Sequence, residues 1–116
     1  MNNTFDTLMT CVVKDKPEEG LTLTTKPIPS DLNSDEVLVK VSYTSVCGTD
    51  YHIYKYDEWA QKRLKLPFTA GHEFSGEIVK LGSDVTCVKL GDIVSAETHI
   101  ICNECEFCLS GNGHIC

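Results

Sequence analysis

The sequence contains no long apolar segment, and this absence excludes two classes of protein. No stretch approaches the roughly 20 apolar residues that a membrane-spanning helix needs, so we expect no membrane partner. Residues 1–6 lack the basic and apolar regions of a secretory signal peptide, which indicates a cytoplasmic protein.

Positive charge is also scarce. The 10 Lys and Arg residues are outnumbered by 17 Asp and Glu residues, which gives a net charge of −7. Proteins that bind nucleic acid need clustered basic side chains, whereas the densest basic run here is Lys62, Arg63 and Lys65. Such a short run is typical of a solvated surface, so we do not expect nucleic acid as a partner.

Cysteine, by contrast, is abundant. There are 7 cysteines, an odd number that would leave one thiol unpaired in a disulfide framework. In a reducing compartment their close spacing indicates metal binding instead. The chain also ends on a cysteine, Cys116, and natural proteins seldom end on a metal ligand. We therefore expect residues 1–116 to be one incomplete domain from the N-terminal part of a longer protein.

Short strands separated by Gly- and Pro-containing turns are predicted over most of the chain. The strands are expected at residues 8–14, 21–26, 36–46, 74–81, 85–88 and 93–96. Between Thr49 and Lys62 the apolar residues recur at helical spacing, which predicts a short helical segment. The fold class is therefore mainly β, as in a small barrel.

Residues 100–116 are expected to form a lobe that lacks a hydrophobic core and carries four cysteines, Cys102, Cys105, Cys108 and Cys116. Four thiolates at this spacing can surround one Zn²⁺ and replace the missing core, so we predict a structural zinc. Disulfides are one alternative. An iron–sulfur cluster is another, but the ferredoxin motif places its fourth cysteine closer to the third, which favours zinc.

A second candidate metal site combines Cys47, His72 and Glu73. Zinc accepts thiolate, imidazole and carboxylate together, and a catalytic zinc keeps one position open. Each residue alone is weak evidence, since a lone cysteine is usually a core residue and a lone histidine a structural one. Adjacent strand residues face opposite sides, so His72 and Glu73 can share a metal only where Gly71 lets the backbone turn.

Thr49 and His52 lie at helical spacing, so a helical turn would place them on one face. A hydroxyl and an imidazole in series can relay a proton to solvent. Spacing alone favours a simpler alternative, in which Thr49 caps a helix and His52 is a surface residue.

The segment from Gly71 to Val85, Gly-His-Glu-x2-Gly-x5-Gly-x2-Val, resembles the signature of the zinc-containing alcohol dehydrogenases, within the medium-chain dehydrogenase/reductase superfamily. The run Cys47-Gly48-Thr49-Asp50 and the four-cysteine lobe match the same family in the same order. Residues 52–61 are more narrowly similar to a segment of the L-threonine 3-dehydrogenases.

The resemblance implies a GroES-like, partly open β-barrel with a short helical segment and a four-cysteine zinc lobe. It implies that Cys47, His72 and Glu73 are ligands or near-ligands of a catalytic zinc, and that Cys102, Cys105, Cys108 and Cys116 hold a structural zinc. Thr49 and His52 would form the proton relay. His99 would lie near the active-site cleft and help to select the substrate, or else is an ordinary loop histidine.

The implied reaction is NAD-linked oxidation of a small secondary alcohol, with L-threonine giving 2-amino-3-ketobutyrate. A polyol or 2,3-butanediol dehydrogenase is one alternative, and for the isolated chain a zinc-binding module without chemistry is another. No G-x-G-x-x-G follows a strand, so no residue here is expected to bind NAD and the isolated chain is expected to be inactive. The full-length protein is expected to form a homo-oligomer, a tetramer.

Overall fold

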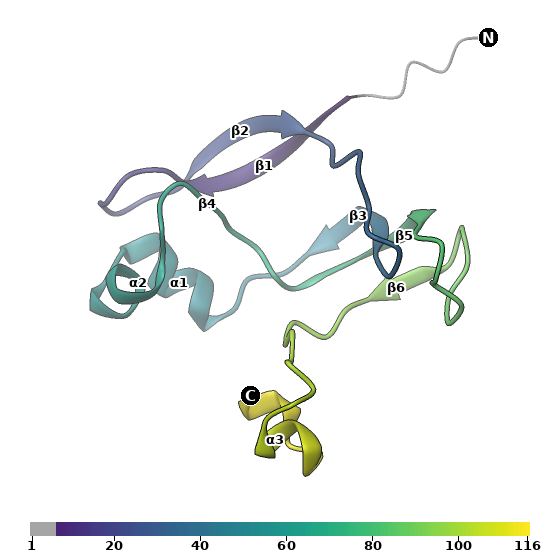
Figure 1. The fold of residues 1–116 in the computed structure, drawn as a ribbon. Helices are drawn as coiled ribbons and strands as arrows, with labels where there is room; N and C mark the ends of the chain where they lie inside the picture. The colour runs from purple at the N-terminus through teal and green to yellow at the C-terminus, as the bar shows by residue number, and fades with distance from the viewer. Residues whose placement is uncertain (1–6) are drawn as a thin grey trace, which may run out of the picture.

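Two antiparallel sheets and two pairs of short helices make up the structure, a computed structural model that describes residues 7–116 (Figure 1). The prediction made from residues 1–6 lies outside the described part. One sheet has the order β2-β1-β4, with β1 (Leu8–Lys14), β2 (Thr22–Pro27) and β4 (Phe68–Thr69). The other has the order β3-β5-β6, with β3 (Val37–Thr44), β5 (Phe74–Leu81) and β6 (Ile93–Ser95). The predicted mainly β architecture with a short helical segment is confirmed.

The first two strands form the predicted hairpin. β1 pairs with β2 from Leu8 opposite Pro27 to Val13 opposite Thr22. Its β-branched residues Thr10, Val12 and Val13 suit a pleated strand, and Gly20, with φ +121°, closes the turn. β2 is an edge strand, which is where a terminal proline is tolerated.

The second sheet is built around β5, which pairs with both β3 and β6. The β3–β5 ladder has two register irregularities, and the second gives β3 one extra residue, Ser42, opposite β5. Strand alternation is therefore broken between Val41 and Tyr43, and the Tyr43 side chain is exposed. At Gly76 the β5 backbone passes so close to β3 that a Cβ would lie 2.2 Å from the Lys40 carbonyl oxygen.

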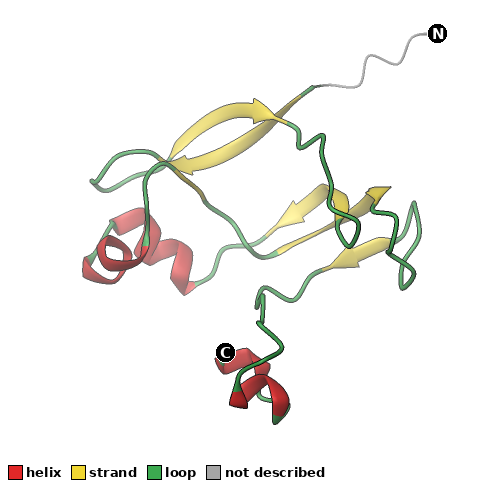
Figure 2. Cartoon of the chain, viewed as in Figure 1, coloured by secondary structure: helices red, strands yellow, loops and turns green. Residues whose placement is uncertain are grey.

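The predicted helical segment is two helices, α1 (Gly48–Lys55) and α2 (Glu58–Arg63) (Figure 2). α1 ends at Tyr56, which adopts a left-handed conformation with φ 49°. Asp57 then starts α2 as its N-cap, and its carboxylate accepts a hydrogen bond from the Ala60 N–H at 3.1 Å. Ile53 of α1 and Ala60 of α2 are the buried apolar residues of the two helices.

Two local predictions were wrong. Residues 85–88 form no strand, because they lie between two turns and Val85 donates its N–H back to the Gly82 carbonyl. β4 was missed because it is only 2 residues long, too short to show strand alternation. It pairs with the end of β1 and so brings the chain from the helices back to the first sheet.

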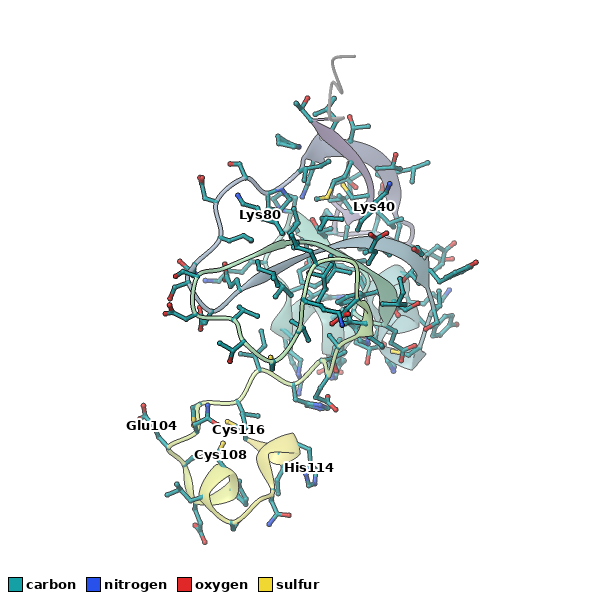
Figure 3. The ribbon with its side chains drawn as sticks, turned by 90° about the vertical axis from the view of Figure 1, so that its right-hand side faces the viewer. Lys40, Lys80, Glu104, Cys108, His114 and Cys116 are labelled. Atoms are coloured by element: carbon teal, nitrogen blue, oxygen red, sulfur yellow. The ribbon has the colours of Figure 1, made fainter. Side chains whose placement is uncertain are left out.

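The molecule is open. Its radius of gyration is 16.6 Å, whereas a compact chain of this length has about 13 Å. Few apolar side chains are fully buried, and the lobe, which contains α3 (Glu106–Leu109) and a 3-10 turn (Gly113–Ile115), projects away from the sheets (Figure 3). Within residues 7–116 there is no helix long and apolar enough to cross a membrane.

Candidate metal centres

Cys47 lies at the point where β3 gives way to α1. It is the N-cap of α1, and its sulfur accepts a hydrogen bond from the Thr49 N–H at 3.3 Å. The Asp50 carboxylate accepts from the Cys47 N–H at 2.9 Å, which completes a capping box. These two bonds fix the Cys47 thiol at the N-terminus of α1. The alternative in which Thr49 caps the helix is wrong.

His72 reaches this thiol from the loop before β5. Its Nε2 lies 3.1 Å from the Cys47 sulfur, and its Nδ1 lies 3.6 Å from the Asp50 carboxylate. Gly71, with φ +100°, provides the backbone turn that brings the ring in. The ligand atoms of Cys47, Asp50 and His72 all lie within 4.8 Å of one another, so this group can hold a metal ion.

The chemistry of this donor set fits zinc. A thiolate and an imidazole on tetrahedral Zn²⁺ have donor atoms about 3.5 Å apart, close to the separation of Cys47 and His72. Because Nε2 faces the sulfur, Asp50 faces the other ring nitrogen. Carboxylates in that position orient a metal-binding imidazole and fix its tautomer.

Glu73 points elsewhere. Its carboxylate accepts a hydrogen bond from the Ser45 hydroxyl at 2.6 Å, and its carbonyl accepts from the Ser45 N–H and the Thr44 hydroxyl. The structure therefore brings Cys47 and His72 together with Asp50, and Glu73 is not part of this group. Glu73 instead lines a cleft of ≈ 430 Å³ whose walls include none of these three residues. The cleft is lined largely by hydroxyl-bearing side chains, among them those of Tyr43, Ser45, Ser75, Ser95 and Thr98.

His52 is held by α2. Its Nδ1 is hydrogen-bonded to the Asp57 carboxylate, and its ring lies 5.7 Å from the Trp59 ring, centroid to centroid. The hydrogen bonds from His52 and from the Ala60 N–H hold the pKa of Asp57 below its usual value. About half of the His52 side chain is exposed, so the ring has access to water.

His99 lies in the loop after β6. Its backbone N–H and its ring Nδ1 both contact the Glu97 carboxylate, and this lowers the pKa of Glu97. The side chain is half exposed. Its neighbour Thr98 lines the cleft beside Glu73, whereas His99 is not among the lining residues.

The four lobe cysteines converge as the spacing predicts. Their sulfurs lie within 4.8 Å of one another, and the closest pairs are separated by 3.5 to 3.9 Å. A tetrahedron with metal–sulfur bonds of ~2.3 Å has edges of about 3.8 Å, so the four sulfurs already match one zinc ion. All 7 cysteines are free thiols, which removes the disulfide alternative in this structure.

Backbone conformation builds the lobe. Asn103, with φ 60°, turns the chain so that the N–H groups of Glu104 and Cys105 both donate to the Cys102 sulfur. These two bonds, together with contacts from the Cys116 and Cys105 thiols, lower the pKa of Cys102 to about 6. Removal from water raises the pKa of Cys108 to about 11. A divalent ion would resolve this opposition, because coordination deprotonates every thiol.

Glu104 and His114 lie on the outside of the lobe, while Cys108 and Cys116 point toward its centre (Figure 3). Glu104 and His114 are not part of the four-cysteine group whose sulfurs converge. The side chains of Glu104 and His114 are both exposed to solvent.

Sequence reasoning gave no role to Asp50 or Asp57. Asp50 follows Cys47 at the spacing of a capping box, and that signal was available. Asp57 precedes the Glu-Trp-Ala run as an N-cap does, but a single helix had been expected across it. Its contact with His52 depends on how α1 and α2 pack, which the sequence does not reveal.

Comparisons with known proteins identify the family to which this chain belongs. The model of the alcohol dehydrogenase GroES-like domain matches residues 33–116. The chain is 57% identical over 112 residues to an L-threonine 3-dehydrogenase of Caldanaerobacter subterraneus subsp. tengcongensis, covering 97% of this chain and 32% of the relative. A Bacillus velezensis L-threonine 3-dehydrogenase is 54% identical, with 93% and 31% covered. An alcohol dehydrogenase structure from Thermus sp. ATN1 superposes with a TM-score of 0.76 at 28% identity, covering 93% of this chain and 30% of that one.

A small open barrel with a cysteine–histidine cluster at a helix start and a separate four-thiol lobe defines the class, that of the GroES-like domains of zinc-dependent dehydrogenases. The chain belongs to the family of alcohol dehydrogenase GroES-like domains. It spans about a third of the length of the curated relatives that it matches.

Proposed function

We propose that the chain is the catalytic domain of a zinc-dependent, NAD-linked dehydrogenase that oxidises a secondary alcohol, with L-threonine as the substrate. The observation that carries the proposal is the convergence of Cys47 and His72 at 3.1 Å, in a chain 57% identical to a named L-threonine 3-dehydrogenase. The product from L-threonine would be 2-amino-3-ketobutyrate. Oxidation removes a hydride from carbon, which NAD⁺ would accept, and a proton from the hydroxyl, which leaves to solvent.

In this proposal Cys47 and His72 hold the catalytic zinc, with Glu73 as a further ligand or near-ligand and Asp50 orienting the His72 ring. Zinc bound there polarises the substrate hydroxyl and lowers its pKa. Thr49 and His52 relay the released proton, and the half-exposed His52 delivers it to water. His99 acts on substrate choice through the loop that reaches the Glu73 cleft.

Cys102, Cys105, Cys108 and Cys116 hold a second, structural zinc in the lobe. Four thiolates leave that ion no open position, so the lobe does no chemistry. The free state of all 7 cysteines agrees with a reducing compartment such as the cytoplasm. The sequence has no glycine-rich dinucleotide motif, so we assign NAD binding, and assembly into a homo-oligomer, to the part of the relatives that this chain does not match.

A chimera tests the proposal directly. This chain replaces the matching third of the Caldanaerobacter relative, and NADH formation is followed with L-threonine and with 2,3-butanediol. We expect a rate with L-threonine that falls at least about 100-fold in Cys47→Ser and after zinc is removed by chelation. The chain alone should give no NAD-dependent rate.

Two results would contradict the proposal. A chimera that oxidises 2,3-butanediol faster than L-threonine would identify a diol dehydrogenase instead. A chimera that folds, binds zinc and oxidises neither alcohol would leave the chain as a zinc-binding module without chemistry.

A further inference from the structure

The His52 imidazole is hydrogen-bonded to Asp57, the N-cap of α2. We propose that Asp57, the N-cap of α2, is a positioning residue that holds the His52 imidazole in the tautomer with Nδ1 protonated, so that Nε2 is the proton acceptor. This inference rests on the proposed function for its kinetic consequence, but the tautomer itself can be measured independently.

The hydrogen-bonding state of Asp57 determines the tautomer. The Ala60 N–H donates to one carboxylate oxygen, and His52 Nδ1 contacts the other. Both contacts lower the pKa of Asp57, so the carboxylate is ionised near neutral pH and can only accept. The proton in the His52–Asp57 bond must therefore belong to Nδ1. In the neutral ring Nε2 is then free of hydrogen and is the basic nitrogen.

A second contact restricts the plane of the ring. The Trp59 ring lies 5.7 Å from the His52 ring with an interplanar angle of 40°. Trp59 is itself held by Arg63, whose guanidinium lies 5.0 Å from the centre of the indole. Asp57, Trp59 and Arg63 all belong to α2 and its cap, so this helix supports His52 from two directions.

The N-cap of α2 therefore also sets the orientation of the His52 ring. Asp57 begins the helix through one oxygen and orients His52 through the other, so the start of α2 fixes where Nε2 points. Thr49 lies one helical turn before His52 on α1.

The test uses substitutions that keep the helix cap. Asp57→Asn retains an oxygen for the Ala60 N–H, since Asn is as good an N-cap as Asp, but presents an amide N–H₂ or a weaker acceptor to His52. Asp57→Ser keeps the cap and removes the contact with His52. Glu58→Gln is the matched control, because it neutralises the next carboxylate on α2, whose partner is Lys62.

The first readout is the protonation pattern of His52. The zinc-loaded chain is labelled with ¹⁵N in histidine, and His52→Asn identifies the His52 signals among the 4 histidines. We expect the Nδ1–H tautomer in the unchanged chain and in Glu58→Gln, and a shift toward Nε2–H in Asp57→Asn. An Nε2–H tautomer of His52 in the unchanged chain would overturn the inference. A His52 tautomer that stays the same in both Asp57 variants would also overturn it.

The second readout is kinetic and uses the chimera described above. Asp57→Asn should lower kcat by about 10- to 100-fold, because a mis-set tautomer removes much of a general base's contribution, with KM within about twofold and zinc content unchanged. An unchanged kcat in an active chimera would overturn the positioning role and leave the proposed function standing. An unchanged chimera that folds and binds zinc but is inactive would refute the proposed function, and the tautomer measurement would still decide whether Asp57 orients the His52 ring.

Discussion

At the scale of single residues, Lys14 is the most unusual side chain in the molecule. It is a lysine with only 1% of its surface exposed. Its ammonium donates to the carbonyl oxygens of Gly20 at 2.9 Å and Tyr54 at 3.1 Å, and to that of Glu18. It also lies 5.1 Å from the centre of the Tyr56 ring. Lys14 therefore joins the turn of the first hairpin to the C-terminal end of α1, where helix carbonyls favour a positive charge.

We predict that Lys14→Met lowers the free energy of unfolding by about 2–4 kcal/mol, because it removes an ammonium that donates to three partly buried carbonyl oxygens. Lys16→Met is the matched control. The Lys16 side chain is 68% exposed and its contact with Glu18 is 3.9 Å long, so its loss should cost less than about 0.5 kcal/mol. Urea unfolding of the zinc-loaded chain measures both, and equal midpoints would contradict this role for Lys14.

A second prediction concerns Asn103, whose left-handed conformation sets the first turn of the lobe. A β-branched residue in that conformation costs about 1–2 kcal/mol, so Asn103→Val should weaken zinc binding by the lobe roughly 5- to 30-fold. Asn112→Val changes the same residue type in the same lobe at an ordinary φ of −101° and should have little effect. Competition with a chromophoric chelator gives both affinities, and equal losses would show that backbone conformation is not the cause.

Residue-level reasoning from the sequence found the four lobe thiols from their close spacing. It found Cys47 and His72 mainly from the resemblance to the dehydrogenase signature. It gave Asp50 no role, and the ligand role of Glu73 stays a prediction. Both are acidic, and the choice between them depends on local geometry. The capping box directs Asp50 toward His72, whereas Ser45 draws the Glu73 carboxylate the other way.

At the scale of elements, Gly76 decides how β5 packs on β3. The position is part of the sequence signature, and the structure supplies the physical reason, because a Cβ added there would lie 2.2 Å from the Lys40 carbonyl oxygen. No side chain larger than hydrogen fits without a shift of one strand. β5 leads directly from His72, so such a shift would also move the candidate metal site.

We predict that Gly76→Ala destabilises the chain by about 3 kcal/mol or more, since it forces a backbone displacement. Gly48→Ala is the comparison, because a Cβ there meets nothing within 4 Å and the residue opens a helix, where alanine is favoured. Thermal unfolding of both variants is the measurement. A Gly76→Ala protein as stable as Gly48→Ala would show that the two strands can separate at little cost.

Elements were predictable where strand alternation or turn residues were strong, as in the first hairpin and β5. They were not where tertiary packing overrides local preference. Residues 85–88 carry two valines yet form no ladder, because they lie between two turns and the Val85 N–H donates back to the Gly82 carbonyl. The break between α1 and α2 depends on the left-handed backbone conformation of Tyr56, which cannot be predicted from the presence of a tyrosine.

At the scale of the whole molecule, the two sheets do not enclose a large core. Val13, Ile53, Ala60 and Ile78 are the buried apolar side chains of the described residues, while Val46, Ile93 and Ile100 are among many that are largely exposed. Apolar burial alone is therefore a small source of stability here. Coordination of metal by the lobe would contribute folding free energy that its few apolar contacts do not supply.

The central claim is that this chain carries two separate metal sites, and the zinc content of the purified chain tests it most directly. Elemental analysis should find about two zinc ions per chain, with about one lost in Cys47→Ser and a different one lost in Cys102→Ser. A single zinc that survives Cys47→Ser, or a content that Cys102→Ser leaves unchanged, would contradict the account.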